Sequence, residues 1–214
     1  MDQTTQNRYK QILGRYLPEK AVDPVFDFLY INHIGFKITK KRRSKLGDYK
    51  WFKYKPGCYE ISVNGDLNKY AFMLVLMHEM AHHLVHLQYG ESVQPHGHEW
   101  QRSFADTMKK YIGMGVFPSD VANAMAVYSS SIPLKIKKER ELMSIINRYN
   151  ENANSKPEIT LNDVPLNTLF KLENHERVFR SVEKRRTRYK CVDIKTNEYF
   201  LVQGTATIFP MEAE

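Results

Sequence analysis

The sequence has few of the features that mark secreted or membrane-spanning proteins. It holds two cysteines in 214 residues, Cys58 and Cys191, which are too few for a disulfide framework or a zinc site built from cysteine pairs. Residues 1–8 lack the apolar core of a signal peptide. The apolar run 71–77 is far shorter than the roughly 20 residues that span a bilayer. We therefore expect a soluble, cytoplasmic protein with no membrane partner.

The chain has fewer acidic residues than basic ones. The chain has 24 Asp and Glu against 32 Lys and Arg, a formal net charge of +8. An excess of positive charge favours polyanionic partners, nucleic acid first. The hydrophobic content of 42% and the aromatic content of 12% are those of a globular protein rather than a disordered one.

The hydrophobic pattern predicts an α+β protein. Apolar residues recur at helical spacing in some segments and alternate as in strands in others. We expect helices at 8–16, 24–31, 68–88, 99–111, 119–127 and 138–149, and strands at 35–40, 49–54 and 59–64. Five short strands follow, within 169–209. The polar segment 150–157 predicts a linker. We therefore divide the chain into a catalytic domain (1–149), a linker (150–157) and a small β module (158–214).

One segment on the longest expected helix contains candidate metal ligands and a candidate catalytic residue. His78, Glu79 and His82 form an H-E-x-x-H motif inside a strongly apolar stretch. Residues four apart share one face of a helix, so both imidazoles can reach one ion. A buried carboxylate and two buried imidazoles would be costly without such a partner. The motif predicts a zinc hydrolase with one catalytic ion, in which Glu79 takes a proton from metal-bound water.

A catalytic zinc needs a third protein ligand and an open position for water. His83 points about 100° away from His82 around the helix, and His86 would require coordination from three successive turns. His96 lies 14 positions beyond His82, between Pro95 and Gly97, where the backbone can fold back towards the metal. We prefer His96 on geometry and keep His98 and Glu99 as alternatives.

The combined motifs resemble a known family. The pattern H-E-x-x-H, a short gap and H-G-x-E-(W/F) matches at His78, Glu79, His82, His96, Gly97, Glu99 and Trp100. It is similar to the SprT-like zinc metalloproteases, which include the Spartan DNA-dependent proteases, and the similarity extends over about residues 8–128. The resemblance implies that His96 is the third ligand and that His98 is at a variable position. It also implies a zincin-like body, in which a small sheet packs on an active-site helix bundle.

The C-terminal module departs from this family. Many SprT-like proteins end in a zinc ribbon built from cysteine pairs, whereas the corresponding region here has only Cys191. We interpret it as a ribbon-like β module without metal. We expect it to be held by the side chains of Phe179, Val182, Tyr189, Val192, Tyr199 and Phe200.

The substrate and the partners follow from the resemblance together with the charge. The leading hypothesis is a DNA-associated endopeptidase that cleaves proteins bound or crosslinked to DNA, a role in DNA repair. Two basic clusters are candidate DNA contacts, because clustered cations neutralise phosphates. The first is Lys40, Lys41, Arg42, Arg43 and Lys45, and the second is centred on Arg185, Arg186 and Arg188.

Three alternatives remain open from the sequence. The chain could be a non-proteolytic DNA-binding protein with a structural zinc, although such a site gains nothing from Glu79. It could also be a zinc hydrolase of nucleic acid, although no acids for a second metal are evident. The strand 59–64 could pair with an extended peptide at a sheet edge, or it could be an ordinary internal strand.

Overall fold

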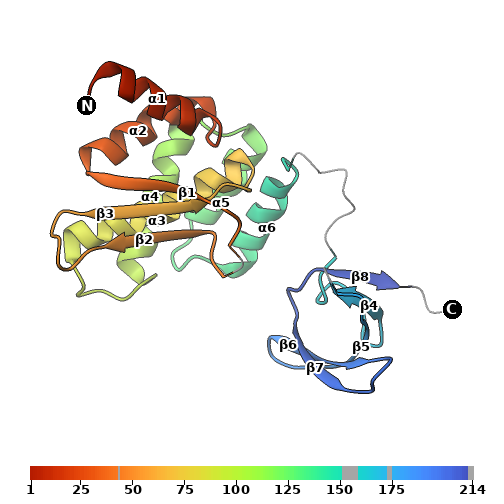
Figure 1. Ribbon diagram of the computed structural model, residues 1–214. Helices are drawn as coiled ribbons and strands as arrows, with labels where there is room; N and C mark the ends of the chain where they lie inside the picture. The colour runs from red at the N-terminus through yellow and green to blue at the C-terminus, as the bar shows by residue number, and fades with distance from the viewer. Residues whose placement is uncertain (43, 151–158, 173–174, 212–214) are drawn as a thin grey trace. The chain divides into compact units, whose positions relative to one another are not determined.

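The computed structural model describes residues 1–42, 44–150, 159–172 and 175–211. The chain forms two compact units, Met1–Glu151 and Asn152–Glu214, and each is described here by itself (Figure 1). The expected linker, 150–157, lies outside the described residues from position 151 onward. Within the described part of the chain, no helix has both the length and the apolar character needed to cross a membrane.

The N-terminal unit is α+β, as predicted. Its elements are α1 (Gln3–Gly14), α2 (Val22–Ile31), β1 (Ile34–Thr39), β2 (Gly47–Trp51), β3 (Tyr59–Asn64), α3 (Lys69–Tyr89), α4 (His98–Gly113), α5 (Ser119–Ser129) and α6 (Ile136–Asn147). Every helix and strand expected in this unit is present, with ends shifted by up to five residues. The largest shift is in α1, because Asp2 caps it by accepting a hydrogen bond from the Thr5 N–H at 2.9 Å.

The three strands form one sheet in the order β1-β3-β2. β1 runs parallel to β3, and β2 pairs with β3 in the antiparallel sense. The hypothesis that segment 59–64 offers a free edge to a peptide is therefore wrong, because β3 is hydrogen-bonded on both sides. Its last four residues are buried, as expected of a central strand. Among the described strands, β1 and β2 instead lie at the two edges of this sheet.

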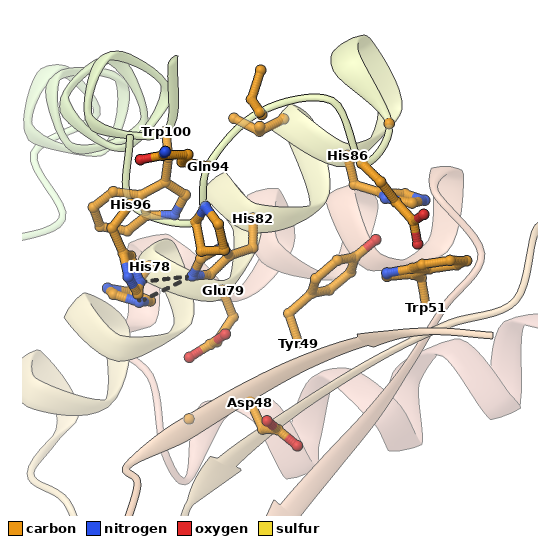
Figure 2. A pocket seen from close by; sticks show the side chains of 16 residues that line it. Asp48, Tyr49, Trp51, His78, Glu79, His82, His86, Gln94, His96 and Trp100 are labelled. Atoms are coloured by element: carbon orange, nitrogen blue, oxygen red, sulfur yellow. Dashed lines mark hydrogen bonds between the residues drawn. The ribbon is translucent and has the colours of Figure 1, made fainter. Parts of the chain in front are cut away.

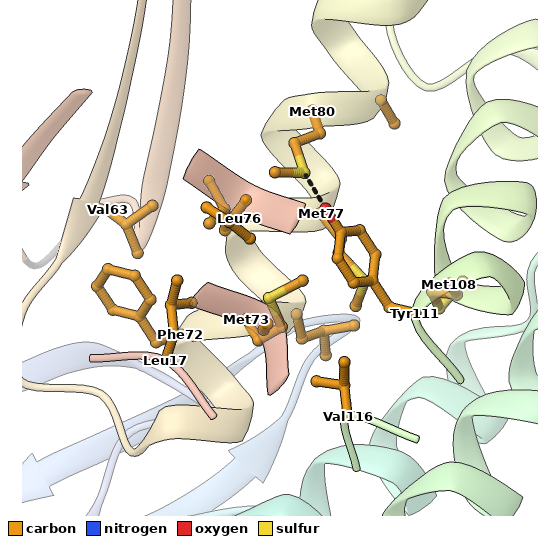
Figure 3. Close-up of a cluster of buried hydrophobic side chains, with 14 of the residues drawn as sticks. Leu17, Val63, Phe72, Met73, Leu76, Met77, Met80, Met108, Tyr111 and Val116 are labelled. Carbon is orange, nitrogen blue, oxygen red and sulfur yellow. Dashed lines mark hydrogen bonds between the residues drawn. The ribbon is translucent and has the colours of Figure 1, made fainter. Parts of the chain in front are cut away.

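Helix α3 is the centre of the hydrophobic core. Its side chains Phe72, Met73, Leu76, Met77 and Met80 are all fully buried. Figure 3 shows them between β3 on one side and α4 on the other. Burying one such side chain stabilises a fold by about 1.5–3 kcal/mol. The core therefore fixes the helix that carries the H-E-x-x-H motif.

The C-terminal unit is an antiparallel sheet with a core of its own. Its strands are β4 (Leu169–Leu172), β5 (Val178–Lys184), β6 (Arg188–Asp193), β7 (Tyr199–Gln203) and β8 (Ile208–Met211), in the order β7-β6-β5-β4-β8. The buried cluster comprises Leu161, Phe170, Phe179, Tyr189, Cys191, Val202 and Ile208. Apolar packing therefore supports this unit, as the scarcity of cysteine suggested.

Two residues expected in that core are exposed. Val182 is 40% exposed and Tyr199 is 61% exposed. Phe179 and Ser181 both point inward, so the regular alternation of β5 turns Val182 outward. Tyr199 begins β7, where the alternation of the strand turns Val202 inward and Tyr199 outward.

Candidate active site

Helix α3 begins and ends at residues that suit a helix terminus. The side chain of Asn68 accepts hydrogen bonds from the backbone N–H groups of Tyr70 and Ala71, at 3.0 and 2.9 Å. At the other end Gly90 has φ 62°, a conformation that favours glycine, and its N–H donates to the His86 carbonyl at 2.9 Å. The sequence signals for this helix, an Asn before it and a Gly after it, are both realised.

The loop after α3 returns the chain to the motif helix and places His96. This residue has φ 59°, a left-handed conformation that is uncommon outside glycine. Its carbonyl accepts a hydrogen bond from Gln101 Nε2 at 3.1 Å, and Gln101 Oε1 accepts one from the Leu134 N–H at 2.9 Å. Gln101 therefore ties the His96 backbone to the segment between α5 and α6.

Three imidazoles converge at one point (Figure 2). The Nε2 atoms of His78 and His82 are 3.2 Å apart, and each lies 3.0 Å from Nε2 of His96. In the described part of the chain, this is the one group of three or more His, Cys, Asp or Glu side chains close enough to share an ion. The structure thus brings together the three residues that the sequence identified as metal ligands.

Trp100 forms the wall against which the three rings pack. Its ring centroid lies 4.5 Å from those of His78 and His96 and 5.2 Å from that of His82. The indole is 5% exposed. Because α4 begins at His98, Trp100 stands in the first turn of that helix, beside the loop that carries His96. A rigid aromatic surface behind three imidazoles restricts the rotamers that they can adopt.

The surroundings keep the imidazoles neutral. Burial, followed by the neighbouring His82 and His96, lowers the pKa of His78 to about 3. Burial and His96 lower the pKa of His82 to about 4. Burial also lowers the pKa of His96. At pH 7 each ring therefore has a free lone pair, which is the form that binds a metal ion.

Glu79 lies on the same helix, buried and 6% exposed. Burial first, and the charge of Asp48 second, raise the pKa of its carboxyl group to about 7. The backbone N–H of Tyr49 donates to this carboxylate and acts in the opposite direction. Carboxyl groups with a pKa near the working pH are suited to general acid–base catalysis. The geometry therefore gives Glu79 the properties of a proton-transfer group.

Strand β2 packs closely against Glu79. A Cβ atom built on Gly47 would overlap Glu79 Oε1 and lie 2.6 Å from Val75 Cγ1. Next to it, burial alone would raise the pKa of Asp48, but the Lys45 and Lys50 ammonium groups outweigh this and lower it. Sequence reasoning missed the roles of Gly47 and Asp48 at the site. The contact of Gly47 with Glu79 depends on the pairing of β2 in the sheet, which no local sequence signal marks.

The remaining histidines considered from the sequence lie elsewhere. His83 is fully buried, with Nδ1 3.3 Å from the Tyr49 hydroxyl. His86 stacks on Trp51, with ring centroids 4.9 Å apart. His98 is the first residue of α4 and lines a different groove from the three convergent imidazoles, together with Glu99. None of them joins the cluster of His78, His82 and His96.

The convergent imidazoles stand in a cleft of about 570 Å³. Its walls come from β2, from α3 and from the loop between α3 and α4. The lining residues include Gly47, Asp48, Tyr49, Trp51, Glu79, Val85, His86, Glu91, Gln94 and Pro95. A cleft of this size accommodates a few residues of an extended peptide.

Comparison with known proteins agrees with this geometry. The model of the SprT-like family matches residues 6–122, more than half of the chain and the whole of the cleft described above. No curated protein and no solved structure matches the chain.

Proposed function

This chain belongs to the SprT-like family, a family of zincin-like metalloproteases, and on that premise we propose that it is a zinc-dependent endopeptidase. The ligands of the single zinc ion are His78, His82 and His96, and Glu79 is the catalytic base. The observation that carries the proposal is the convergence of three neutral Nε2 atoms beside a buried carboxyl group.

The residues present fit a zinc ion. Zinc binds imidazole nitrogen at about 2.0–2.1 Å, so three ligands in tetrahedral arrangement stand roughly 3.3 Å from one another. The observed separations of 3.0–3.2 Å are close to that value. Three nitrogens are also the number that a catalytic zinc takes from the protein. When bound, zinc supplies a Lewis acid that polarises a carbonyl group and lowers the pKa of water.

Glu79 performs the proton transfers. Its carboxylate takes a proton from the attacking water and returns it to the nitrogen of the leaving amine. The Tyr49 N–H donates to the carboxylate, and the carboxylate fills the space beside Gly47 that a Cβ atom would occupy. The raised pKa of Glu79 makes it a better acceptor than a solvent-exposed glutamate, because a stronger base takes the proton more readily.

The free edge of β2 is the proposed binding site for the peptide backbone. In an antiparallel pair, residues whose backbone groups bond to the neighbouring strand alternate with residues whose groups face away from it. The Asn64 N–H donates to the Leu46 carbonyl at 2.9 Å, so Leu46 and every second residue after it face β3. The backbone groups of Gly47, Tyr49 and Trp51 therefore face away from β3, and of Tyr49 the carbonyl is the group offered to a substrate, because its N–H acts on Glu79. A substrate strand that pairs with them would lie along the cleft, since all three residues line it.

We propose proteins bound or crosslinked to DNA as the substrates, and DNA as a partner. In the first basic cluster Lys40 and Lys41 are exposed. Lys45 pairs with Asp48 at 2.8 Å, and Arg43 lies outside the described residues. Arg42 is left out of the proposed DNA surface because its guanidinium donates to Asn64 Oδ1 and Ser62 Oγ, at 2.8 and 3.0 Å.

The second basic cluster supports the same proposal better. Arg185, Arg186 and Arg188 are all exposed around the β5–β6 hairpin. On the neighbouring strands Lys190 Nζ lies 4.0 Å from the centroid of the Tyr199 ring. Exposed cations and an exposed aromatic ring on the same small sheet suit a single-stranded nucleic acid, whose phosphates and bases they can contact.

Two sets of variants test the catalytic assignment. Glu79→Gln is expected to bind one equivalent of zinc and to lose peptide hydrolysis. His96→Ala is expected to lose zinc, whereas the matched His98→Ala is expected to retain it, with metal content measured by mass spectrometry of the native protein. Full cleavage by Glu79→Gln, or the reverse pattern of metal contents, would overturn the assignment.

One assay tests the substrate class. The zinc-loaded chain is incubated with single-stranded DNA and a protein crosslinked to it, and both polymers are followed on gels. We expect cleavage of the protein, and a loss of DNA binding with added salt. Cleavage of the DNA would support a nuclease instead, and binding without any cleavage would support a DNA-binding protein with a structural zinc.

A further inference from the structure

A second, smaller pocket adjoins the cleft that holds the proposed metal ligands. This pocket, of about 190 Å³, is lined by Trp51, Phe52, Lys53, Pro56, Gly57, Cys58, Tyr59 and His86. Trp51 and His86 also line the larger cleft. The two spaces therefore share one wall, which Figure 2 shows on the opposite side of Tyr49 from the three metal ligands.

The shared wall is a stacked pair of rings. The Trp51 and His86 rings are 4.9 Å apart at their centroids, with their planes 23° from parallel. The Tyr49 and Tyr59 rings border His86, at 6.1 and 5.9 Å. Both members of the pair are half-buried, so each has one face against the protein and part of its surface open to the cleft. Lys53 is the single Lys, Arg, Asp or Glu among the residues that line the smaller pocket.

We infer that the Trp51–His86 pair and the pocket behind it form a subsite that selects a large apolar or aromatic side chain of the substrate. The inference rests on the proposed peptidase function, and it names a preference that the metal site alone does not supply. Aromatic walls with little charge favour such side chains, because stacking adds to the burial of apolar area. A single well-fitted apolar group changes the specificity of an enzyme by roughly tenfold or more.

The spacing places this subsite close to the cleaved bond. His86 follows His82 by four residues, which is about 6 Å along a helix. Trp51 follows Tyr49 by two residues of strand β2, which is roughly 6.6 Å. A peptide paired with β2 advances by the same distance in two residues. We place the cleaved bond beside Tyr49 and His82, which line the same cleft, so the selected side chain is the second residue from that bond, on the side towards Trp51.

Peptide binding to the inactive Glu79→Gln protein tests the subsite without cleavage. The full chain is loaded with one equivalent of zinc, and fluorescent ten-residue peptides carry one Phe, Leu, Ser or Asp in a Gly-Ala background. We expect the Phe and Leu peptides to bind about tenfold more tightly than the Ser and Asp peptides. Adding Trp51→Ala to this protein should reduce that ratio to less than about twofold. Adding Tyr54→Ala, at a residue that is 95% exposed in the loop after β2, should leave it unchanged.

Cleavage by the native chain supplies the second measurement. Mass spectrometry of the products should show cuts at a fixed distance of two residues when the Phe is moved along the peptide. If Trp51→Ala does not fold, His86→Ala carries the same test. The subsite would be overturned if the Asp peptide bound most tightly, or if neither Trp51→Ala nor His86→Ala changed the ratio of peptide affinities. It would also be overturned if the position of the cut did not follow the position of the Phe. If the native chain cleaves none of the peptides but the binding preference still depends on Trp51, the peptidase function is refuted and the subsite is retained.

Discussion

Gly47 and Glu79 are in direct contact, although they come from an edge strand and from the central helix. The space that a side chain at position 47 would occupy is filled by the Glu79 carboxylate and by Val75. The two residues after Gly47 also act on the same carboxyl group, Asp48 through its charge and Tyr49 through its backbone N–H. Strand β2 thus determines the position and the proton affinity of the proposed base.

We predict that Gly47→Ala impairs catalysis without loss of metal. The added Cβ displaces the Glu79 carboxylate, and a misplacement of about 1 Å can cost on the order of 100-fold in rate. The measurements are kcat/KM on a peptide and zinc content. Gly113→Ala is the matched control, because a Cβ there meets nothing within 4 Å. Equal activity of the two variants would show that the contact has no catalytic role.

Gln101 is predicted to govern zinc affinity through His96. Without its bond to the His96 carbonyl, the left-handed backbone of His96 loses a restraint, and residues that orient a ligand typically contribute 10–100-fold in metal affinity. Gln101→Ala should weaken zinc binding by about tenfold in a chelator competition. Gln101→Glu should do the same, since a carboxylate can accept from Leu134 but cannot donate to His96. The exposed neighbour Arg102 supplies a control, Arg102→Ala, which should bind zinc normally.

Arg42 is predicted to act on stability rather than on DNA binding. Asn64 is fully buried, and it receives a hydrogen bond from Arg42 Nε and donates to the Arg42 carbonyl. Removing a charged partner of a buried polar group costs about 1.5–3 kcal/mol. Both Arg42→Ala and Arg42→Lys should lower the free energy of unfolding by that order, because lysine cannot reproduce the guanidinium geometry.

The comparison of those two variants separates the roles of Arg42. A DNA contact made through charge alone would survive in Arg42→Lys, and the stability of the protein would be unchanged. Lys41→Ala, at an exposed neighbour, is the control for charge removal. Urea unfolding and DNA titration at fixed salt are the two measurements. Normal stability of Arg42→Lys would contradict the structural role.

Glu79 is predicted to make the metal-free protein less stable as the pH rises. Its carboxyl has a pKa of about 7 in the folded chain, against an ordinary value of 4.5, so the folded state keeps a proton that the unfolded state releases. The free energy of unfolding therefore decreases between pH 4.5 and 7 by up to about 3 kcal/mol from this group. The free energy of unfolding of Glu79→Gln does not show this decrease, because the amide does not titrate.

The test is the stability of Glu79→Gln relative to the parent chain, both with the metal removed by a chelator. The difference in free energy of unfolding should grow in favour of the variant from pH 5.5 to 7 and then level off. Comparing the two proteins at each pH cancels the contributions of the histidines, whose lowered pKa values act in the opposite direction. A difference that is constant with pH would show that the Glu79 pKa is not raised.

The sequence was sufficient for features that depend on local pattern. The extent of α3 followed from its apolar run, the Asn68 cap and the terminal Gly90, and the convergence of His78, His82 and His96 followed from spacing and from the family motif. These features are encoded within one continuous stretch of the chain, residues 68–96.

Features that depend on strand order or on distant contacts could not be predicted in this way. Alternation identified segment 59–64 as a strand but could not show that it is flanked on both sides, since edge and centre are decided by pairing. The contact between Gln101 and Leu134 joins positions 33 residues apart, and no local signal marks it.

The position of Trp100 would make the proposed metal centre visible to spectroscopy. The chain has two tryptophans, and this one touches each imidazole of the triad while being shielded from solvent. The fluorescence of Trp100 is therefore sensitive to whether those three rings bind a metal ion. Filling the centre with a coloured, paramagnetic ion such as Co²⁺ would quench the indole, and the loss of light would follow occupancy in real time without an added dye.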